Sequence, residues 1–197
     1  MNLKHFATTF LVFAGMAVWP AISLAAESHA CTSGKPTQRS YTWDFRGEAS
    51  RLLSGIQADA ANVHRRANKL DVYAADPQIT WQVHAEQLTS IKREVNDMGR
   101  KLCRLEAIRR VVAPWQREAI DRTVPSVTLV ANSTQDAVLF LNHNQRSLWL
   151  PAYGKYVANI DRDSGRISHS IRTFEEYAKV RGEDLHLRNE LGMKARS

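Results

Sequence analysis

The sequence predicts an all-α protein: an antiparallel up-down-up-down four-helix bundle with an N-terminal arm and a short C-terminal tail helix. Apolar residues recur at steps of three and four along most of residues 42–182, which is the period of an amphipathic helix. Prolines and polar breaks divide this pattern into four segments of about 30 residues each. Four such helices, each about 45 Å long and joined by short connections, suit a bundle whose neighbours run antiparallel. The competing arrangement is a pair of helical hairpins packed less regularly.

The first 25 residues have the features of an export signal. A short basic start containing Lys4 precedes an uncharged stretch, and Pro20 breaks a helix before small residues that end at Ala25. The alternative is an uncleaved membrane anchor, since about 20 apolar residues can span a bilayer. Pro20 and the small residues favour cleavage after Ala25. We therefore expect an exported protein, periplasmic or secreted, that consists of residues 26–197.

The next 16 residues, 26–41, are polar and aperiodic and predict an extended arm. The first helix follows, and Asp76 is expected to cap a second helix whose first residue is Pro77. The apolar stripe of the first helix is Ala49, Leu52, Ile56, Ala60, Val63, Ala67, Leu70 and Ala74. The stripe of the second helix is Trp81, His84, Leu88, Ile91, Val95, Met98, Leu102 and Leu105.

Pro114 opens the third helix and Pro151 the fourth, because proline is favoured at the first helical position. Gly182 is expected to end the fourth helix, so the bundle covers residues 42–182 and the tail covers 183–197. The third stripe is Ile120, Val127, Val130, Ala137, Val138 and Leu141. The fourth is Tyr153, Val157, Ile160, Ser164, Ile167, Ile171, Phe174 and Ala178.

Four tryptophans fall near the predicted helix starts: Trp43, Trp81, Trp115 and Trp149, the last three 34 residues apart. Tetratricopeptide repeats have the same period, but they pack two short helices into it and need small and aromatic residues that are absent here. In an alternating bundle Trp43 and Trp115 lie at one end, and Trp81 and Trp149 at the other. We expect them to plug the two ends of the core. The alternative is an exposed pair that forms a platform for a ligand or partner.

The composition indicates one soluble, basic domain. The chain has 27 Lys and Arg against 20 Asp and Glu, and its net charge of +7 falls to +6 when Lys4 leaves with the signal. Nucleophile elbows, glycine-rich phosphate loops, metalloprotease motifs and haem-attachment motifs are absent from the sequence. The core stripes contain no glutamate for a di-iron site. We therefore expect a protein that is not an enzyme and carries no cofactor.

His84 occupies a core position of the second helix and falls level with Tyr156 of the fourth. We expect a buried hydrogen bond between these side chains, because it satisfies both. The alternative is a cofactor site in which His84 and Tyr156 contact a haem or a metal. A haem iron needs a second axial ligand, and Met98 lies about 21 Å further along the same helix, too far to share an iron with His84.

The chain has two cysteines, Cys31 in the arm and Cys103 near the end of the second helix. The arm enters the bundle at the end where Cys103 lies, and about 12 residues at roughly 3.3 Å each can reach it. In an oxidising compartment we expect a disulfide between them, worth about 4 kcal/mol in the chain-entropy model. Two free thiols are the alternative.

Positive charge gathers in the second half of the second helix and in the connection after it. The seven bases there are Lys92, Arg93, Arg100, Lys101, Arg104, Arg109 and Arg110. Such a face can attract an anionic component of the cell envelope. Nucleic acid is not an expected partner, because no aromatic residues are interleaved for base stacking. The alternative is a solvated helix face with ordinary ion pairs.

The third helix carries little charge: Asp136 is the only charged residue between residues 123 and 142, and Pro125 predicts a kink. A partner protein, a second copy of the chain, a ligand or the arm is expected to cover its outer face. The residues of this predicted surface are Pro125, Thr128, Asn132 and Gln135. Alternatively, Pro125 only distorts a helix that is otherwise well buried.

These features together predict an exported, non-enzymatic helical bundle that acts through its surface, as an envelope-associated or partner-binding protein. The second hypothesis is a bundle that binds a small molecule or cofactor in its interior, near His84, Tyr156 and the kink in the third helix. An enzyme ranks third, because the sequence contains no identifiable nucleophile–base pair.

Overall fold

The computed structural model describes residues 45–76 and 78–192, and its fold is the four-helix bundle predicted from the sequence. The helices are α1 (Phe45–Ala74), α2 (Trp81–Ile108), α3 (Pro114–His143) and α4 (Pro151–Glu190), with a short 3-10 helix, η1 (Arg109–Val111), between α2 and α3. The expected export signal and arm lie outside the described residues, as do Cys31 and Trp43.

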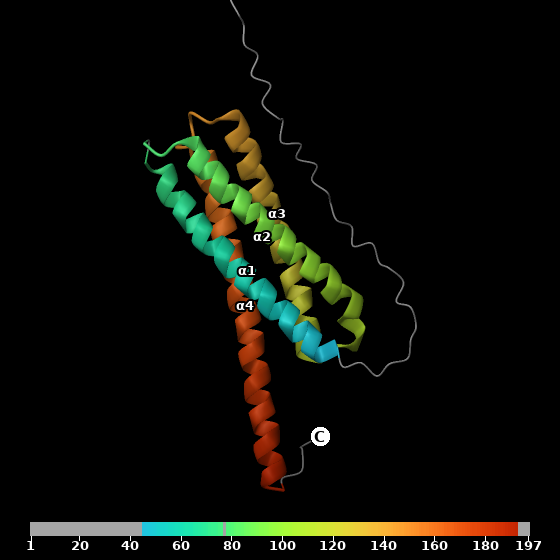
Figure 1. Ribbon diagram of the computed structural model, residues 1–197. Coiled ribbons are helices and arrows are strands. Elements are labelled where there is room, and N and C mark those ends of the chain that lie inside the picture. The colour runs from blue at the N-terminus through green and yellow to red at the C-terminus, as the bar shows by residue number, and fades with distance from the viewer. Residues whose placement is uncertain (1–44, 77, 193–197) are drawn as a thin grey trace, which may run out of the picture. The chain divides into compact units, whose positions relative to one another are not determined.

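The four helices close into a ring. Each packs against its neighbour in sequence, and α1 also packs along α4 (Figure 1). The connections are short, so successive helices run antiparallel. Two connections, α1–α2 and α3–α4, lie at one end of the bundle, which we call the two-loop end.

The core is aliphatic and follows the predicted stripes. Every stripe position of α2 from His84 to Leu105 is buried. In α1 the register differs in detail, because Leu53 is fully buried while Leu52 only packs against the edge of the core. Burial of a leucine or isoleucine side chain contributes about 1.5–3 kcal/mol, so the stripes supply the main stabilisation of the bundle.

The start of α2 differs from the prediction. The helix begins at Trp81 and not at residue 77, because Asp76 forms a turn. The Oδ1 atom of Asp76 accepts a hydrogen bond from the backbone N–H of Gln78 at 2.9 Å, and its carbonyl accepts one from the N–H of Ile79 at 3.1 Å. This local bonding competes with helix and moves the helix start to the following turn.

The end of α4 also differs from the prediction. Gly182 lies within the helix, which continues to Glu190, so the expected separate tail helix is the last part of α4. A glycine inside a helix is less stable than alanine by only about 1 kcal/mol. Side-chain pairs along the helix offset part of this cost; one of them joins Asp184 and Arg188 at 2.9 Å.

The end opposite the two-loop end is tied by a buried glutamine. Gln116 is only 1% exposed. Its side-chain amide donates to the carbonyl of Arg46 at 2.8 Å and to the hydroxyl of Ser50 at 3.0 Å, and its oxygen accepts from the N–H of Ala113 at 2.9 Å. The two bonds from the amide nitrogen join the start of α3 to the first turns of α1, and the third caps the start of α3 itself.

Candidate functional site

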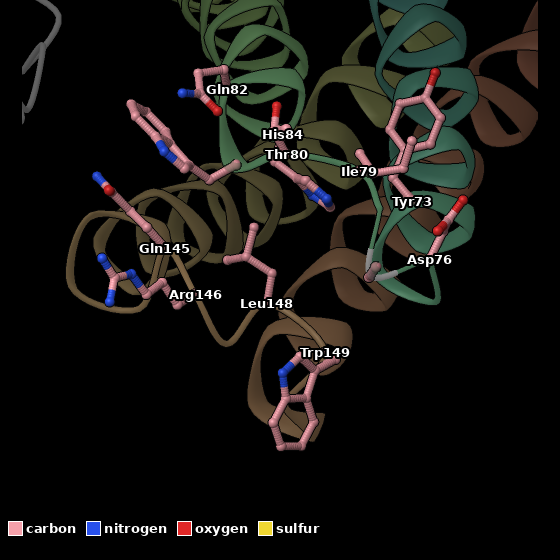
Figure 2. A pocket seen from close by; sticks show the side chains of 12 residues that line it. Tyr73, Asp76, Ile79, Thr80, Gln82, His84, Gln145, Arg146, Leu148 and Trp149 are labelled. Atoms are coloured by element: carbon pink, nitrogen blue, oxygen red, sulfur yellow. The ribbon is translucent and has the colours of Figure 1, made fainter.

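A pocket of about 460 Å³ lies at the two-loop end of the bundle (Figure 2). Its walls come from the last turn of α1, both connections at this end and the first turn of α2. Tight turns hold the α3–α4 connection: the N–H of Ser147 donates to the carbonyl of Asn144 at 2.8 Å, and the N–H of Leu150 to that of Ser147 at 3.2 Å. These turns define the α3–α4 side of the pocket.

His84 lines the inner wall of the pocket and forms a buried pair with Tyr153, which lies behind that wall. Nδ1 of His84 lies 3.0 Å from the hydroxyl of Tyr153, and neither side chain is more than 1% exposed. The ring of Tyr73 meets the imidazole edge-on at 6.1 Å, and Phe140 stacks on Tyr153 at 5.8 Å. Aromatic packing on several sides fixes the position of the imidazole.

Both members of this pair are neutral near pH 7. Burial lowers the pKa of His84 and raises the pKa of Tyr153, because the low-dielectric surroundings disfavour either charged form. No other described group accepts from the Tyr153 hydroxyl, so we assign this hydroxyl as the donor to Nδ1. The imidazole proton then resides on Nε2.

The predicted hydrogen-bond partner of His84, Tyr156, is wrong by about one helical turn, because the partner is Tyr153. Tyr156 does not bond to His84; it is half-buried and meets Phe140 edge-on at 6.3 Å. The reason is the depth of the helix starts: α2 begins at Trp81 and α4 at residue 151, so His84 and Tyr153 both lie in a first turn. A cofactor role for His84 and Tyr156 stays a prediction.

Of the two tryptophans at this end, only Trp81 packs against the core. Trp149 is 67% exposed, and the adjacent Leu148 is buried in its place. The turn between Ser147 and Leu150 directs one of two consecutive side chains inward and the other outward. The prediction that Trp149 plugs the core is therefore wrong, whereas Trp115 at the other end does pack against the core.

The rim of the pocket carries one base and one acid. Arg146 precedes Trp149 on the same connection and forms no ion pair or hydrogen bond with a described residue. Asp76, across the pocket, already accepts the hydrogen bond from Gln78. The amide groups of Gln82 and Gln145 add neutral polar atoms. The rim thus offers an unpaired guanidinium on its α3–α4 side, together with one carboxylate and two neutral amides.

Ion pairs occupy four of the seven bases of the predicted anion-binding face. The pairs are Arg100–Asp97, Lys101–Asp59, Arg104–Glu48 and Arg109–Asp121. Arg104 donates to both carboxylate oxygens of Glu48, at 2.6 and 3.1 Å, and lowers the pKa of that carboxyl. The pairing of these bases fits the alternative of an ordinary solvated face.

The remaining three bases, Lys92, Arg93 and Arg110, form no ion pair with a described residue. Lys92 and Arg93 line a hollow of about 330 Å³ along α2, which Asp97 and Arg100 also line. Arg110 is exposed in η1, at the far end of α2. Anion binding stays a prediction and rests on Lys92 and Arg93.

The outer face of α3 is exposed within the described part of the chain. Pro125, Thr128 and Asn132 are exposed and Gln135 is half-buried. Leu129 is 52% exposed on this face, and Pro125 lies inside a continuous helix. Whether a partner or the arm covers this face stays a prediction.

The predicted disulfide cannot be followed to both ends, because Cys31 lies outside the described residues. Cys103 is half-buried and precedes Arg104, whose ion pair with Glu48 places this part of α2 beside the first turn of α1. The disulfide stays a prediction.

Residues 45–76 and 78–192 hold no group of three or more His, Cys, Asp or Glu side chains placed to bind a metal ion. None of their helices combines the length and apolar character that crossing a bilayer requires.

Two lining residues of the pocket, Tyr73 and Arg146, were not predicted from the sequence. Tyr73 lies off the apolar stripe of α1, and Arg146 lies in a connection that has no periodicity. The one available signal was the position of Arg146 three residues before an aromatic residue at a helix start.

Comparisons with protein-family models, curated proteins and solved structures found no match to this chain.

Proposed function

We propose that this chain is an exported binding protein without catalytic activity, and that the pocket at the two-loop end holds a small organic anion with an aromatic or other planar part. One observation carries the proposal: the exposed Trp149 and the unpaired Arg146 both line the rim of the same pocket. Ligand pockets commonly combine apolar walls with a few polar groups in this way.

The indole of Trp149 offers the planar contact. A ligand that covers roughly 100 Å² of this ring would gain about 2.5 kcal/mol from burial of apolar surface. Trp81 and Tyr73 extend the aromatic lining inward from the rim. An aromatic or planar ligand gains most from such walls, because ring stacking adds to the burial of area.

The guanidinium of Arg146 selects an anion. Arginine binds carboxylates and phosphates through two parallel hydrogen bonds, and a charge-assisted hydrogen bond contributes about 1.5–3 kcal/mol. Asp76 is the acid of the rim and would repel an anion placed beside it. The charged end of the ligand is therefore expected on the α3–α4 side of the pocket.

Binding fits the inner wall better than catalysis does. His84 is the one side chain of the lining with an ordinary pKa near neutrality, and its Nδ1 is already bonded to Tyr153. Burial keeps His84 neutral, and both rings are packed on several sides. A rigid, neutral wall of this kind suits recognition of a ligand.

Calorimetric titration of residues 26–197 with phenyl phosphate and with 4-hydroxybenzoate tests the proposal, with benzyl alcohol as the neutral probe. Arg146→Gln is expected to weaken binding of either anion by about tenfold or more, as loss of a charge-assisted bond implies. Trp149→Ala is expected to weaken all three probes. Arg110→Gln removes an exposed arginine at the opposite end and serves as the matched control.

Equal losses in Arg146→Gln and Arg110→Gln would show that the anions respond to net charge alone and would overturn the proposal. Absence of saturable binding for both anions would overturn the ligand class. Export is tested separately by fractionation of the native host. A chain that begins at residue 26 in the periplasm or the medium is the expected result.

A second function, recognition of a partner protein by α3, is supported by the exposed apolar side chains on its weakly charged outer face. Leu129 and Leu139 are both more than 40% exposed there. A photo-crosslinking residue at Leu129 is expected to capture a specific protein in the native host. The same residue at Val72, which is 68% exposed on α1, is the control. Identical products at both positions would count against a partner site on α3.

A further inference from the structure

The last part of α4 extends beyond the packed core. α4 has 40 residues, so it is about 60 Å long, whereas the other three helices have 28 to 30 and are about 45 Å long. Figure 1 shows its final turns projecting past the ends of the other helices. No described residue of α4 after Ile171 is buried. We call residues 175–191 the distal segment.

The distal segment carries its own apolar stripe. Tyr177, Val180, Leu187 and Leu191 are each more than half exposed. With Asp184 they form a series at steps of three, four, three and four, which is the seam of a coiled coil. In heptad notation Tyr177, Asp184 and Leu191 occupy the a positions, and Val180 and Leu187 the d positions.

This seam faces away from the bundle. Val180 follows Ile171 by nine residues, and at about 100° per residue the two side chains lie on opposite sides of the helix. Ile171 is fully buried on the side that packs against the neighbouring helices. The seam is therefore no continuation of the core stripe, and α1 and α3 cannot cover it.

The charged residues beside the seam are arranged by sign, with acids on one side of it and bases on the other. Each a position is preceded by a glutamate, at the g positions, and each d position is followed by an arginine, at the e positions. The glutamates are Glu176, Glu183 and Glu190, and the arginines are Arg181 and Arg188. In a parallel pair of coiled-coil helices, a g residue faces the next e residue of the other helix.

We propose that the distal segment pairs in parallel with the distal segment of a second copy of this chain. In that pair Glu176 faces Arg181 of the second copy and Glu183 faces its Arg188, in both directions. An antiparallel pair would place g against g and e against e, so glutamate would face glutamate and arginine would face arginine. The charge pattern thus selects both the partner and its direction.

Positive charge on α4 limits how far the paired segment can extend toward the bundle. Arg162 and Arg166 lie 18 and 14 residues before Val180, which places them on the same side of the helix. Their nearest acid, Asp163, is only 3% exposed. Like charges therefore separate the two copies before Tyr177, and the pairing is confined to about two heptads.

Asp184 lowers the affinity of the pair. A polar residue at one a position fixes the register of a coiled coil at a cost in stability. Two Asp184 carboxylates would face each other, although each already pairs with Arg188 of its own chain at 2.9 Å. We therefore expect a reversible dimer that Asp184→Leu strengthens by at least about tenfold.

Sedimentation equilibrium of residues 26–197 over a concentration series tests the proposal. Leu187→Lys is expected to weaken the dimer by about tenfold or more, because it places a charge in the seam. Leu185→Lys is the matched control: Leu185 and Leu187 are 50% and 54% exposed, but Leu185 lies off the seam. Neither change touches the core, so circular dichroism and thermal melting should show an intact bundle in both variants.

Direction is tested by cross-linking. In a parallel pair two copies of Leu191→Cys face each other and form an interchain disulfide under mild oxidation, whereas Leu185→Cys should not. A wild-type chain that stays monomeric at the highest attainable concentration overturns the proposal. So does a dimer that Leu185→Lys and Leu187→Lys weaken equally, or one that cross-links equally at the two positions.

Discussion

Replacement of Tyr153 by phenylalanine tests the buried polar pair behind the pocket. The change removes only the hydroxyl that lies 3.0 Å from Nδ1 of His84. The phenylalanine ring can keep the stacking contact with Phe140 at 5.8 Å and the buried position of the tyrosine ring. Any loss of stability therefore reports on the hydrogen bond and not on packing.

The expected loss is about 1–3 kcal/mol, the cost of a buried polar atom left without a partner. In a domain of this size that lowers the melting temperature by roughly 2–4 °C per kcal/mol. His84→Leu leaves the Tyr153 hydroxyl unpaired and should produce a similar loss. The double variant His84→Leu with Tyr153→Phe removes both polar groups, so it should be less destabilised than the two single losses added together.

Urea unfolding, followed by far-ultraviolet circular dichroism, measures the free energy of unfolding of the wild type, the two single variants and the double variant. Tyr156→Phe is the matched control, because the Tyr156 hydroxyl forms no hydrogen bond with a described residue. It should change the free energy of unfolding by less than about 0.5 kcal/mol. A Tyr153→Phe protein as stable as the wild type would show that the bond to His84 does not stabilise the bundle. So would a Tyr156→Phe protein that is destabilised as much as Tyr153→Phe.

Three more predictions concern stability and one concerns covalent structure. Burial lowers the pKa of His84 below its usual value of 6.5, so on acidification the unfolded chain binds a proton at this residue before the folded chain does. The free energy of unfolding should therefore fall as the pH drops below 6.5, by up to about 1.4 kcal/mol per pH unit. His84→Leu should flatten this slope in urea titrations at several pH values. Gln116→Leu removes two hydrogen bonds from α3 to α1 and one to the N–H of Ala113, and it should lower the free energy of unfolding by about 1–3 kcal/mol in the same assay. Pro125→Ala restores a helical N–H at an exposed position and should stabilise the protein by up to about 3 kcal/mol, seen as a higher melting temperature; an unchanged or lower value would show that the helix is adapted to the proline. Intact mass before and after reduction should show that Cys31 and Cys103 pair in the exported chain, and alkylation of both thiols without reductant would refute the pairing.

The helices could be predicted from the sequence because helix periodicity and burial report the same fact. A stripe such as Leu88, Ile91, Val95 and Met98 is apolar only if one side of the helix meets a core, and all four side chains are buried. Helix ends were harder to predict, because a single local bond decides them. Asp76 moved the start of α2 by bonding to Gln78, and nothing at Gly182 stopped α4.

The site was less predictable than the fold because it depends on depth along the helices and on the loops. The stripe placed His84 in the core correctly, but only the lengths of the connections decide whether Tyr153 or Tyr156 lies opposite it. Leu148 and Trp149 are consecutive apolar residues in a turn, where no period indicates which one faces inward. Arg146 belongs to the same turn, so its place on the rim could be found only in the structure.

The two ends of the bundle are built differently, and this difference separates folding from binding. At the end where α1 and α3 begin, the polar side chains bond to other protein groups. Gln116 bonds to the carbonyl of Arg46, and the ion pairs Arg104–Glu48 and Arg109–Asp121 join neighbouring elements. At the two-loop end a large indole and a guanidinium have no described partner. Substitutions at the first end should therefore lower stability, while Arg146→Gln and Trp149→Ala should leave stability within about 0.5 kcal/mol of the wild type. If these two variants destabilise the bundle instead, Trp149 and Arg146 serve to stabilise the fold, and the proposal of a binding site at the two-loop end is wrong.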